Sequence, residues 1–211
     1  PRIDPLECDF ALSLSDLDPE LIKLANKECL LSSTYEPSSK TKMKLRAAPG
    51  AGTMYLQSEC AEALAELFAG AEEAGYKLYL KSAYRAYKTQ KTMYNNRLER
   101  NNGKDDGWVS KPGASDHQTG LGCDVVPGSW KDKSMNSNMA STPECQWMAE
   151  HCYEYGFVIR YPEDKQDITE INYEPWHLRY VGKEVARYIW RNGLCLEEFH
   201  QQLQAAIDAY L

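Results

Sequence analysis

The sequence of 211 residues contains no run of about 20 apolar residues, the length that a helix needs to cross a membrane, so we expect no transmembrane segment. Positive charge is also limited. The chain has 24 Lys and Arg residues and 31 Asp and Glu residues, which gives a net charge of -7. The short basic runs form no basic stripe, so we expect no nucleic-acid partner. Internal repeats and low-complexity tracts are absent. A chain of this length is most simply one domain, or at most two small ones.

The cysteines do not form a metal-binding pattern. Seven are present, but none belongs to a C-x-x-C pair, which argues against a thiolate zinc site. Cys145 and Cys152 would lie two helical turns apart, about 10 Å, beyond the Cα reach of a disulfide. An odd count leaves at least one thiol unpaired within the chain. The pairing of the others and the redox compartment stay open.

Apolar periodicity, punctuated by glycine and proline, predicts an alternation of helices and short strands. After an irregular lead-in over residues 1–17, Asp18-Pro19 is typical of a helix N-cap followed by a first helical proline. We expect helices over residues 18–28, 56–74, 88–101 and 142–155, with more helix after residue 180. We expect strands over residues 76–81, 123–126, 157–161 and 174–180, and loops over 32–52, 103–113 and 127–141. This order predicts an α+β fold, in which helices pack around a small, mainly antiparallel sheet.

One stretch, residues 115–124, holds a histidine and an aspartate seven residues apart with two glycines between them. At roughly 3.3 Å per residue, His117 and Asp124 on one straight strand would lie too far apart to share an ion. Metal ligand atoms need to be about 2.0–2.2 Å from the metal, so the chain between them must fold back. Gly120 and Gly122 can adopt the backbone angles that such a bend needs. The stretch therefore indicates half of a metal site.

A second stretch supplies candidates for the other half. Glu174 and His177 lie three residues apart, and Pro175 favours an extended backbone at Glu174. We expect a kink that lets both side chains point into one cleft. The chain has four histidines, and two of them fall in these two stretches. His151 and His200 have no ligand pattern nearby, and we expect them to be structural or exposed.

Together the two stretches carry the motif Ser115-x-His117-x-x-Gly120-x-Gly122-x-Asp124 and the motif Glu174-x-Trp176-His177. This combination closely resembles the zinc D-Ala-D-Ala carboxypeptidases of the vancomycin-resistance type. The relatives of that family include D,D-dipeptidases, L,D-carboxypeptidases and phage peptidoglycan endopeptidases. The resemblance runs from about Leu56 to Glu198. One departure is Gly122, where the family usually has alanine; losing a methyl group alters packing but removes no functional group.

Three further segments resemble the family: Ser82-x-Tyr84-Arg85 with Gln90 after it, Phe157-x-x-Arg160-Tyr161-Pro162, and Arg179-Tyr180-Val181-Gly182. The resemblance implies one Zn²⁺ per chain, held by His117, Asp124 and His177 with water in a fourth position. Three protein ligands are typical of catalytic rather than structural zinc. It also implies that Glu174 is the base that takes the proton of that water. Arg85 would stabilise the oxyanion that forms on the peptide carbonyl.

Four other residues are candidates for contact with the substrate. Ser115 and Gln90 are expected to bind it or to orient the ligands, and Tyr84 and Trp176 to shape the cleft. We expect residues 1–55 to form a lead-in, helix and loop packed on a zinc peptidase domain spanning 56–211.

The resemblance implies a carboxypeptidase that removes D-Ala from peptidoglycan stem peptides. Such a substrate predicts a location outside the cytoplasmic membrane, exported or anchored at the bacterial cell envelope, and we expect a monomer. The chain begins at Pro1, which fits a processed or trimmed protein that has lost any export signal. The same zinc chemistry also fits an L,D-carboxypeptidase, a D,D-dipeptidase or an endopeptidase. A non-catalytic zinc module that binds cell wall is a further alternative, which the presence of Glu174 and Arg85 disfavours.

Overall fold

The computed structural model describes residues 12–13 and 17–210. Its centre is a four-stranded sheet in which every neighbouring pair is antiparallel. In spatial order the strands are β3 (Leu78–Ser82), β4 (Gly122–Pro127), β6 (His177–Tyr180) and β5 (Phe157–Ile159). A second, two-stranded sheet pairs β1 (Thr41–Lys42) with β2 (Tyr55–Leu56). The predicted antiparallel sheet is therefore confirmed.

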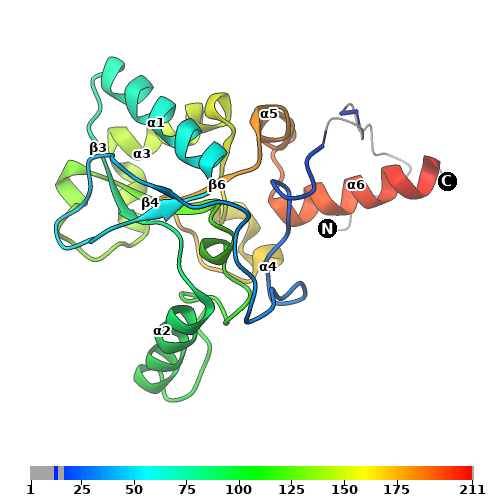
Figure 1. Cartoon of the computed structure of the whole chain (residues 1–211), viewed down its shortest axis with the longest axis horizontal. Coiled ribbons are helices and arrows are strands. Elements are labelled where there is room, and N and C mark those ends of the chain that lie inside the picture. Colours follow the sequence, from blue (N-terminus) through cyan, green and yellow to red (C-terminus); the bar gives the residue numbers. More distant parts are fainter. Residues whose placement is uncertain (1–11, 14–16, 211) are drawn as a thin grey trace.

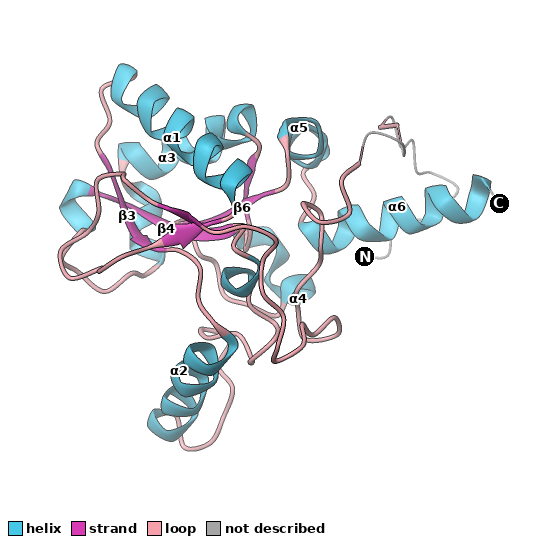
Figure 2. Cartoon of the chain, viewed as in Figure 1, coloured by secondary structure: helices cyan, strands magenta, loops and turns pink. Residues whose placement is uncertain are grey.

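Helices surround this sheet, as expected for an α+β fold. They are α1 (Ser58–Glu73), α2 (Tyr87–Arg100), α3 (Pro143–His151), α4 (Gln166–Thr169), α5 (Lys183–Asn192) and α6 (Leu196–Tyr210). In Figures 1 and 2, α1 and α3 lie on one side of the sheet and α2 projects from the opposite side. Helix α6 extends away from the sheet. None of the helices in the described ranges is both long enough and apolar enough to span a bilayer.

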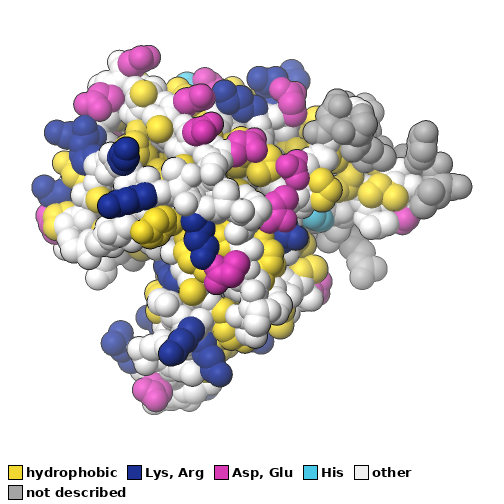
Figure 3. Space-filling model, viewed as in Figure 1, with side chains coloured by type: hydrophobic (Ala, Val, Ile, Leu, Met, Phe, Trp, Pro, Cys, Tyr) yellow, Lys and Arg dark blue, Asp and Glu magenta, His cyan; other side chains and the backbone are white. Residues whose placement is uncertain are grey.

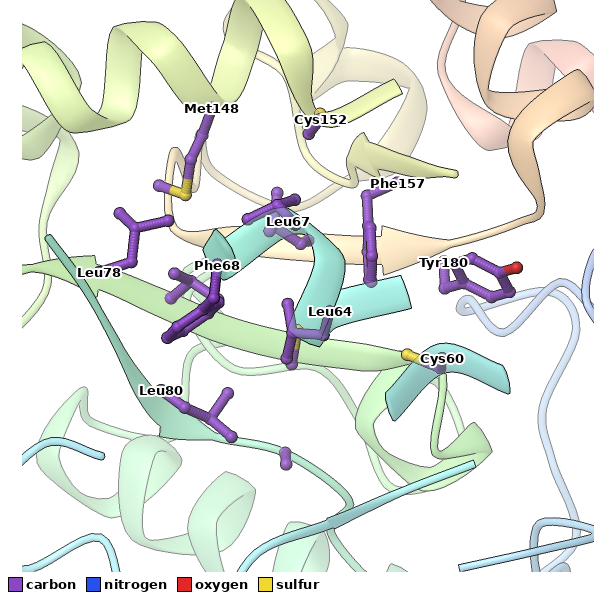
Figure 4. Packing of buried hydrophobic residues seen from close by; sticks show 14 of the residues in the cluster. Cys60, Leu64, Leu67, Phe68, Leu78, Leu80, Met148, Cys152, Phe157 and Tyr180 are labelled. Atoms are coloured by element: carbon purple, nitrogen blue, oxygen red, sulfur yellow. The ribbon is translucent and has the colours of Figure 1, made fainter. Parts of the chain in front are cut away.

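The hydrophobic core lies between α1 and the sheet. Leu64 and Leu67 of α1 are fully buried and belong to one cluster with Leu78 and Leu80, the alternate buried residues of β3 (Figure 4). Met148 of α3 closes the same cluster. The predicted apolar stripe of the first long helix is thus confirmed, except that Ala65 faces solvent. On the face shown in Figure 3, acidic and basic side chains are interspersed on the surface.

The predicted ends of the 142–155 segment agree with the structure. The Thr142 hydroxyl accepts from the Cys145 N–H, and Pro143 occupies the first turn of α3. A 3₁₀ turn over residues 152–155 follows, and Gly156, at φ +87°, ends it. The left-handed conformation at Gly156 turns the chain directly into β5.

The helix predicted over residues 18–28 is wrong. The chain makes a single turn there, closed by the Ile22 N–H donating to the Asp18 carbonyl at 3.2 Å, and then continues without helix. The carbonyls that a helix would use instead accept from side chains of the domain body. Arg179 Nη2 donates to Leu21 O and Lys23 O, both at 2.8 Å. Tertiary hydrogen bonds therefore override the local capping signal.

Six of the seven cysteines lie in the described ranges, and all six are free thiols. Cys29 is exposed and the other five are buried. Burial raises the pKa of Cys145 to about 11 and the pKa of Cys152 and Cys195 to about 12. Burial also raises the pKa of Cys60 and Cys123. The seventh residue, Cys8, lies outside the described residues.

Candidate functional site

The glycine-bearing stretch folds back as the sequence predicts. Residues Asp116–Thr119 form one 3₁₀ turn, η3, whose N-cap hydroxyl on Ser115 accepts from the His117 N–H at 3.3 Å. Gly120 ends the turn at φ +71°, a left-handed conformation that favours glycine. The chain then enters β4, which carries Asp124. His117 and Asp124 therefore meet across a tight bend.

Gly122 plays a different part from the one predicted. It lies in β4, and its φ is outside the left-handed region. A Cβ at this position would lie 2.9 Å from Asp116 Cβ and 3.0 Å from the Asp116 carbonyl carbon. Gly122 thus permits the close approach of η3 to the strand, whereas Gly120 supplies the bend.

The second predicted half-site is built by a turn rather than by a kinked strand. Strand β6 begins at His177, three residues later than expected, and the His177 N–H donates to the Glu174 carbonyl at 3.1 Å. This turn brings Glu174 Oε2 to 3.2 Å from His177 Nδ1. His177 is also the ladder partner of Asp124 in the β4–β6 pair. The two half-sites therefore meet in the sheet itself.

The three predicted metal ligands form one buried cluster. Ligand atoms of His117, Asp124 and His177 all lie within 4.8 Å of one another. His117 Nε2 is 3.3 Å from Asp124 Oδ2, and His177 Nδ1 is 3.5 Å from Asp124 Oδ1. His117 Nδ1 lies 2.7 Å from the Ala83 carbonyl, which fixes the ring with Nε2 towards the cluster. The geometry is suited to holding one ion.

Polar atoms of the cluster and the charge states of His117 and Asp124 fit a metal cation; burial would lower the pKa of His177, but Glu174 and Asp124 outweigh it and raise this pKa. In the described part of the chain, Asp124 Oδ1, 3.5 Å from His177 Nδ1, is buried without a hydrogen-bond partner. Burial, assisted by the nearby Arg85, lowers the pKa of His117, which leaves a neutral imidazole. Burial alone would raise the pKa of Asp124, but His117 and His177 outweigh it and lower this pKa to about 2. A neutral imidazole and an ionised carboxylate are the forms that bind metals.

Glu174 stands beside the cluster in a different environment. Its carboxylate is buried, at 8% exposure, and burial raises its pKa against the opposing effect of His177. A raised pKa makes a carboxylate a stronger proton acceptor near neutral pH. Its position is suited to exchanging protons with a group bound at the cluster.

Arg85 lies against the same cluster and is held from two sides. Its Nη1 donates to Gln90 Oε1 and its Nη2 to the Ser82 hydroxyl, each at 2.9 Å. The Arg85 backbone N–H donates to the His117 carbonyl at 3.0 Å. Gln90 is fixed in turn, because its Nε2 donates to the Ser110 carbonyl at 2.7 Å. Gln90 therefore positions the guanidinium, in addition to lining the cavity.

A cavity of about 370 Å³ opens over the cluster. The predicted residues Ser115, Gln90 and Trp176 line it, together with Arg85 and Glu174. Tyr84 does not line this cavity. Its hydroxyl donates to Glu36 at 2.8 Å on the surface, so the structure separates it from the other predicted site residues.

Residues 53–183 match the family model VanY, D-alanyl-D-alanine carboxypeptidase. The chain belongs to this family. The protein YodJ of Bacillus subtilis (strain 168) is 38% identical over 191 residues, which cover 89% of this chain and 70% of YodJ. These matches confirm the predicted family resemblance.

Two solved structures extend the comparison to the fold. That of the LdcB LD-carboxypeptidase has a TM-score of 0.80 at 38% identity, covering 90% of this chain and 92% of that chain. The second is a glutamate-to-alanine mutant of the vancomycin-resistance D,D-pentapeptidase VanY from a VanB-type cassette, in complex with Zn(II). It has a TM-score of 0.70 at 28% identity and covers 85% of this chain and 98% of that chain. The zinc complex belongs to that relative, and this chain has a buried cluster that could hold a metal.

Within this family fold, sequence reasoning missed several cavity residues. The Tyr161 ring packs edge-on against His177, with the ring centroids 5.0 Å apart. Trp108 stacks on Trp176 at 6.4 Å and forms one wall of the cavity. Tyr161 lay in a segment recognised as resembling the family, but the segment gave it no role. Trp108 lay in a predicted loop, and the only feature of the sequence that could have pointed to it is the presence of a single tryptophan in that loop.

Proposed function

We propose that this carboxypeptidase-family chain is a zinc-dependent enzyme that removes the terminal D-alanine from peptidoglycan stem peptides. The observation that carries the proposal is the position of Glu174. Its buried carboxylate lies 3.2 Å from a predicted ligand, at the edge of a three-residue cluster that lines a cavity. A zinc-dependent peptidase site needs a set of metal ligands, an adjacent base and room for the substrate, and the candidates for these three features coincide here.

His117, Asp124 and His177 would hold the zinc ion. Two imidazoles and one carboxylate leave a coordination position open, as in catalytic zinc sites. A zinc ion held by these three residues would supply a Lewis acid, which typically lowers the pKa of a bound water towards about 7. The lone pair of His117 is presented to the cluster because its Nδ1 is committed to the Ala83 carbonyl.

Glu174 would act as the base and then as the acid. Its carboxylate accepts a proton from the attacking water as the oxygen–carbon bond forms at the scissile carbonyl. It then delivers that proton to the amine nitrogen as the carbon–nitrogen bond breaks, so D-alanine leaves with a neutral or protonated amine. The raised pKa of Glu174 suits both steps. It makes the carboxylate a stronger base towards the attacking water, and the carboxyl group that results is still acidic enough to protonate the leaving amine.

Arg85 would stabilise the oxyanion that develops on the scissile carbonyl. A guanidinium fixed by Gln90 and Ser82 needs no reorganisation when the charge forms. Ser115, Gln90 and Trp176 would contact the substrate as cavity-lining residues. The substrate lies outside the cytoplasmic membrane, so we place the protein at the cell envelope.

A second candidate is an L,D-carboxypeptidase with the same chemistry. The observation that favours it is the high structural similarity to the LdcB LD-carboxypeptidase, at a TM-score of 0.80 and 38% identity. The two activities differ in the residue that precedes the scissile bond, and therefore in how the cavity accommodates that residue.

The experiment compares D-alanine release from three substrates by zinc-loaded and chelator-treated protein. The substrates are a stem pentapeptide ending in D-Ala-D-Ala, a stem tetrapeptide ending in a single D-Ala, and free D-Ala-D-Ala. We expect zinc-dependent release from the pentapeptide above the other two. Preference for the tetrapeptide would replace the proposal by the L,D-carboxypeptidase. Zinc-loaded protein that releases nothing from any of the three would overturn both.

A further inference from the structure

Asp116 is the neighbour of the proposed zinc ligand His117 on turn η3, and its side chain is completely buried. Both of its oxygens accept from arginines. Arg160 Nε donates to Oδ2 at 2.6 Å, and Arg179 Nη1 donates to Oδ1 at 2.7 Å. Charge-assisted hydrogen bonds of this length, away from water, fix the geometry of the groups they join.

Both arginines belong to the segments that hold the other histidine ligand. Arg179 lies on β6, two residues after His177. The Arg160 backbone N–H donates to the His177 carbonyl at 3.0 Å, and the next residue, Tyr161, packs its ring against His177. Asp116 therefore joins the turn that carries His117 to the two segments that position His177.

Every nitrogen of the two guanidinium groups donates at least one hydrogen bond, so these groups have little freedom. Arg160 Nη1 and Nη2 donate to the two oxygens of Glu197, at 2.8 and 2.7 Å. Arg179 Nε donates to the Tyr180 carbonyl, and its Nη2 reaches the carbonyls of residues 21 and 23. Two arginines and two carboxylates thus balance in charge within the core.

We propose that Asp116 is a positioning residue for the metal: its carboxylate sets the separation and orientation of His117 relative to His177. The close approach of Gly122 to Asp116 supports this role, because it leaves η3 no room to move towards β4. Glu197, on α6, balances the same network, but its carboxylate contacts Arg160 and Asn26 and not the turn that carries His117. The proposal rests on the zinc site of the proposed function.

The test compares Asp116→Asn with the matched change Glu197→Gln in the full chain. Each removes one buried carboxylate charge and keeps the shape of the side chain, so both should lower the stability of the fold. Zinc affinity of each apoprotein is measured by competition with a chelator of known affinity. We expect Asp116→Asn to weaken zinc binding about 10–100-fold, and Glu197→Gln to change it by less than about 3-fold.

A second pair of variants keeps the proposal testable if Asp116→Asn does not fold. Asp116→Glu and Glu197→Asp keep both charges and change the carboxylate reach by one methylene. Zinc affinity should again fall only with the change at residue 116, and the visible spectrum of the Co²⁺-substituted protein should shift with it. Equal effects of the paired changes on zinc affinity would reduce Asp116 to a fold-stabilising residue. Wild-type protein that binds no zinc would instead refute the proposed function.

Discussion

The buried carboxylate of Glu174 is the base in the mechanism that we propose. Its pKa is raised by burial, whereas that of Asp124 is lowered to about 2 by the histidines. We expect Glu174→Gln to reduce D-alanine release about 10²–10⁴-fold, because the variant cannot accept a proton. Zinc content, measured by elemental analysis, should stay at the wild-type value. Loss of the metal from this variant would make Glu174 a ligand.

His117→Ala is the complementary control for that prediction. It removes a proposed ligand whose Nε2 faces Asp124 at 3.3 Å, so zinc content itself should fall. The two variants therefore separate metal binding from proton transfer, although both lose activity.

Arg85 gives a second prediction for a single residue. Arg85→Ala should lower kcat about 10²–10³-fold, because a fixed donor to the oxyanion is lost. Gln90→Ala should lower kcat by a smaller factor, because the guanidinium keeps its bond to Ser82 but loses that to Gln90. Arg100→Ala, on the exposed end of α2, is the control and should leave kcat and KM unchanged. Unchanged kinetics of Arg85→Ala would refute the oxyanion role.

For single residues, the sequence could predict which side chains are candidates for the site, but not where all of these side chains point or what they contact. The resemblance of the paired motifs to the family pointed to His117, Asp124 and His177, and the structure places their ligand atoms within 4.8 Å of one another. Tyr84 shares a motif with Arg85, yet successive side chains of an extended chain point in different directions, and Tyr84 lies outside the cavity. Asp116 occupies a position that the quoted motif leaves unspecified, so its contacts with Arg160 and Arg179 became evident only in the structure.

The element that decides the site is the turn η3 and its exit at Gly120. Gly120→Ala should lower the free energy of unfolding by about 1–2 kcal/mol from the left-handed conformation alone, which disfavours a Cβ. Crowding adds to this cost, because the new Cβ would lie 3.2 Å from Gln57 Cγ and from Pro37 Cβ. Urea unfolding of the apoprotein measures the loss.

Gly193→Ala is the matched control for the turn. Gly193 ends α5 at φ +59°, and apart from its own stretch of backbone no heavy atom of the described residues lies within 4 Å of where its Cβ would be. It therefore reports the backbone cost without the crowding, and we expect it to be less destabilising than Gly120→Ala. Equal losses would show that the surroundings of Gly120 adapt freely.

Elements with strong local signals were predictable. The stretch of α1 carries an apolar stripe closed by Gly75, and α3 carries its Thr142 cap, so local physics and the fold agree. The helix predicted after Asp18 fails because Arg179 and Arg160 take its carbonyls, and no local pattern reveals partners more than 130 residues away. The β6 strand starts at His177 for a related reason, since the preceding turn serves the site.

Across the whole molecule, buried charge links stability to pH. Burial would raise the pKa of Glu197, but Arg160 outweighs it and lowers this pKa. A carboxyl group with a lowered folded pKa stabilises the protein above its unfolded pKa, about 4.3, and loses that contribution as the pH falls through the folded pKa. The unfolding free energy of the wild type should therefore exceed that of Glu197→Gln by about 3 kcal/mol at neutral pH.

The check is urea unfolding of both apoproteins between pH 7 and pH 3. The difference in unfolding free energy should be constant down to about pH 4.3 and then shrink, because below that pH the unfolded chain binds a proton at residue 197 that the folded protein does not. A difference that stays constant throughout this range would mean that the pKa of Glu197 is the same in the folded and unfolded chains, so that Arg160 does not lower it.

The arrangement of the whole chain was only partly predictable. Composition and element order indicated the α+β class, which the sheet order and the family match confirm. Contacts between residues 20–26 and the two buried arginines support our proposal that the first 55 residues pack on the peptidase domain. These contacts join distant parts of the chain. A single arginine that makes such a contact produces no periodic pattern in the sequence from which the contact could be predicted.

The reactivity of the buried cysteine thiols can report local unfolding of this protein. Five described cysteines are buried, with pKa values raised by that burial, and their protonated sulfurs are shielded from electrophiles. Alkylating reagents should thus modify the exposed Cys29 at once, and each buried thiol only when its surroundings transiently unfold. Cys60 and Cys123 lie in the core beneath the site, while Cys195 lies at the start of α6. Mass spectrometry of the labelled peptides over time would therefore rank the regions of the fold by the frequency with which they open.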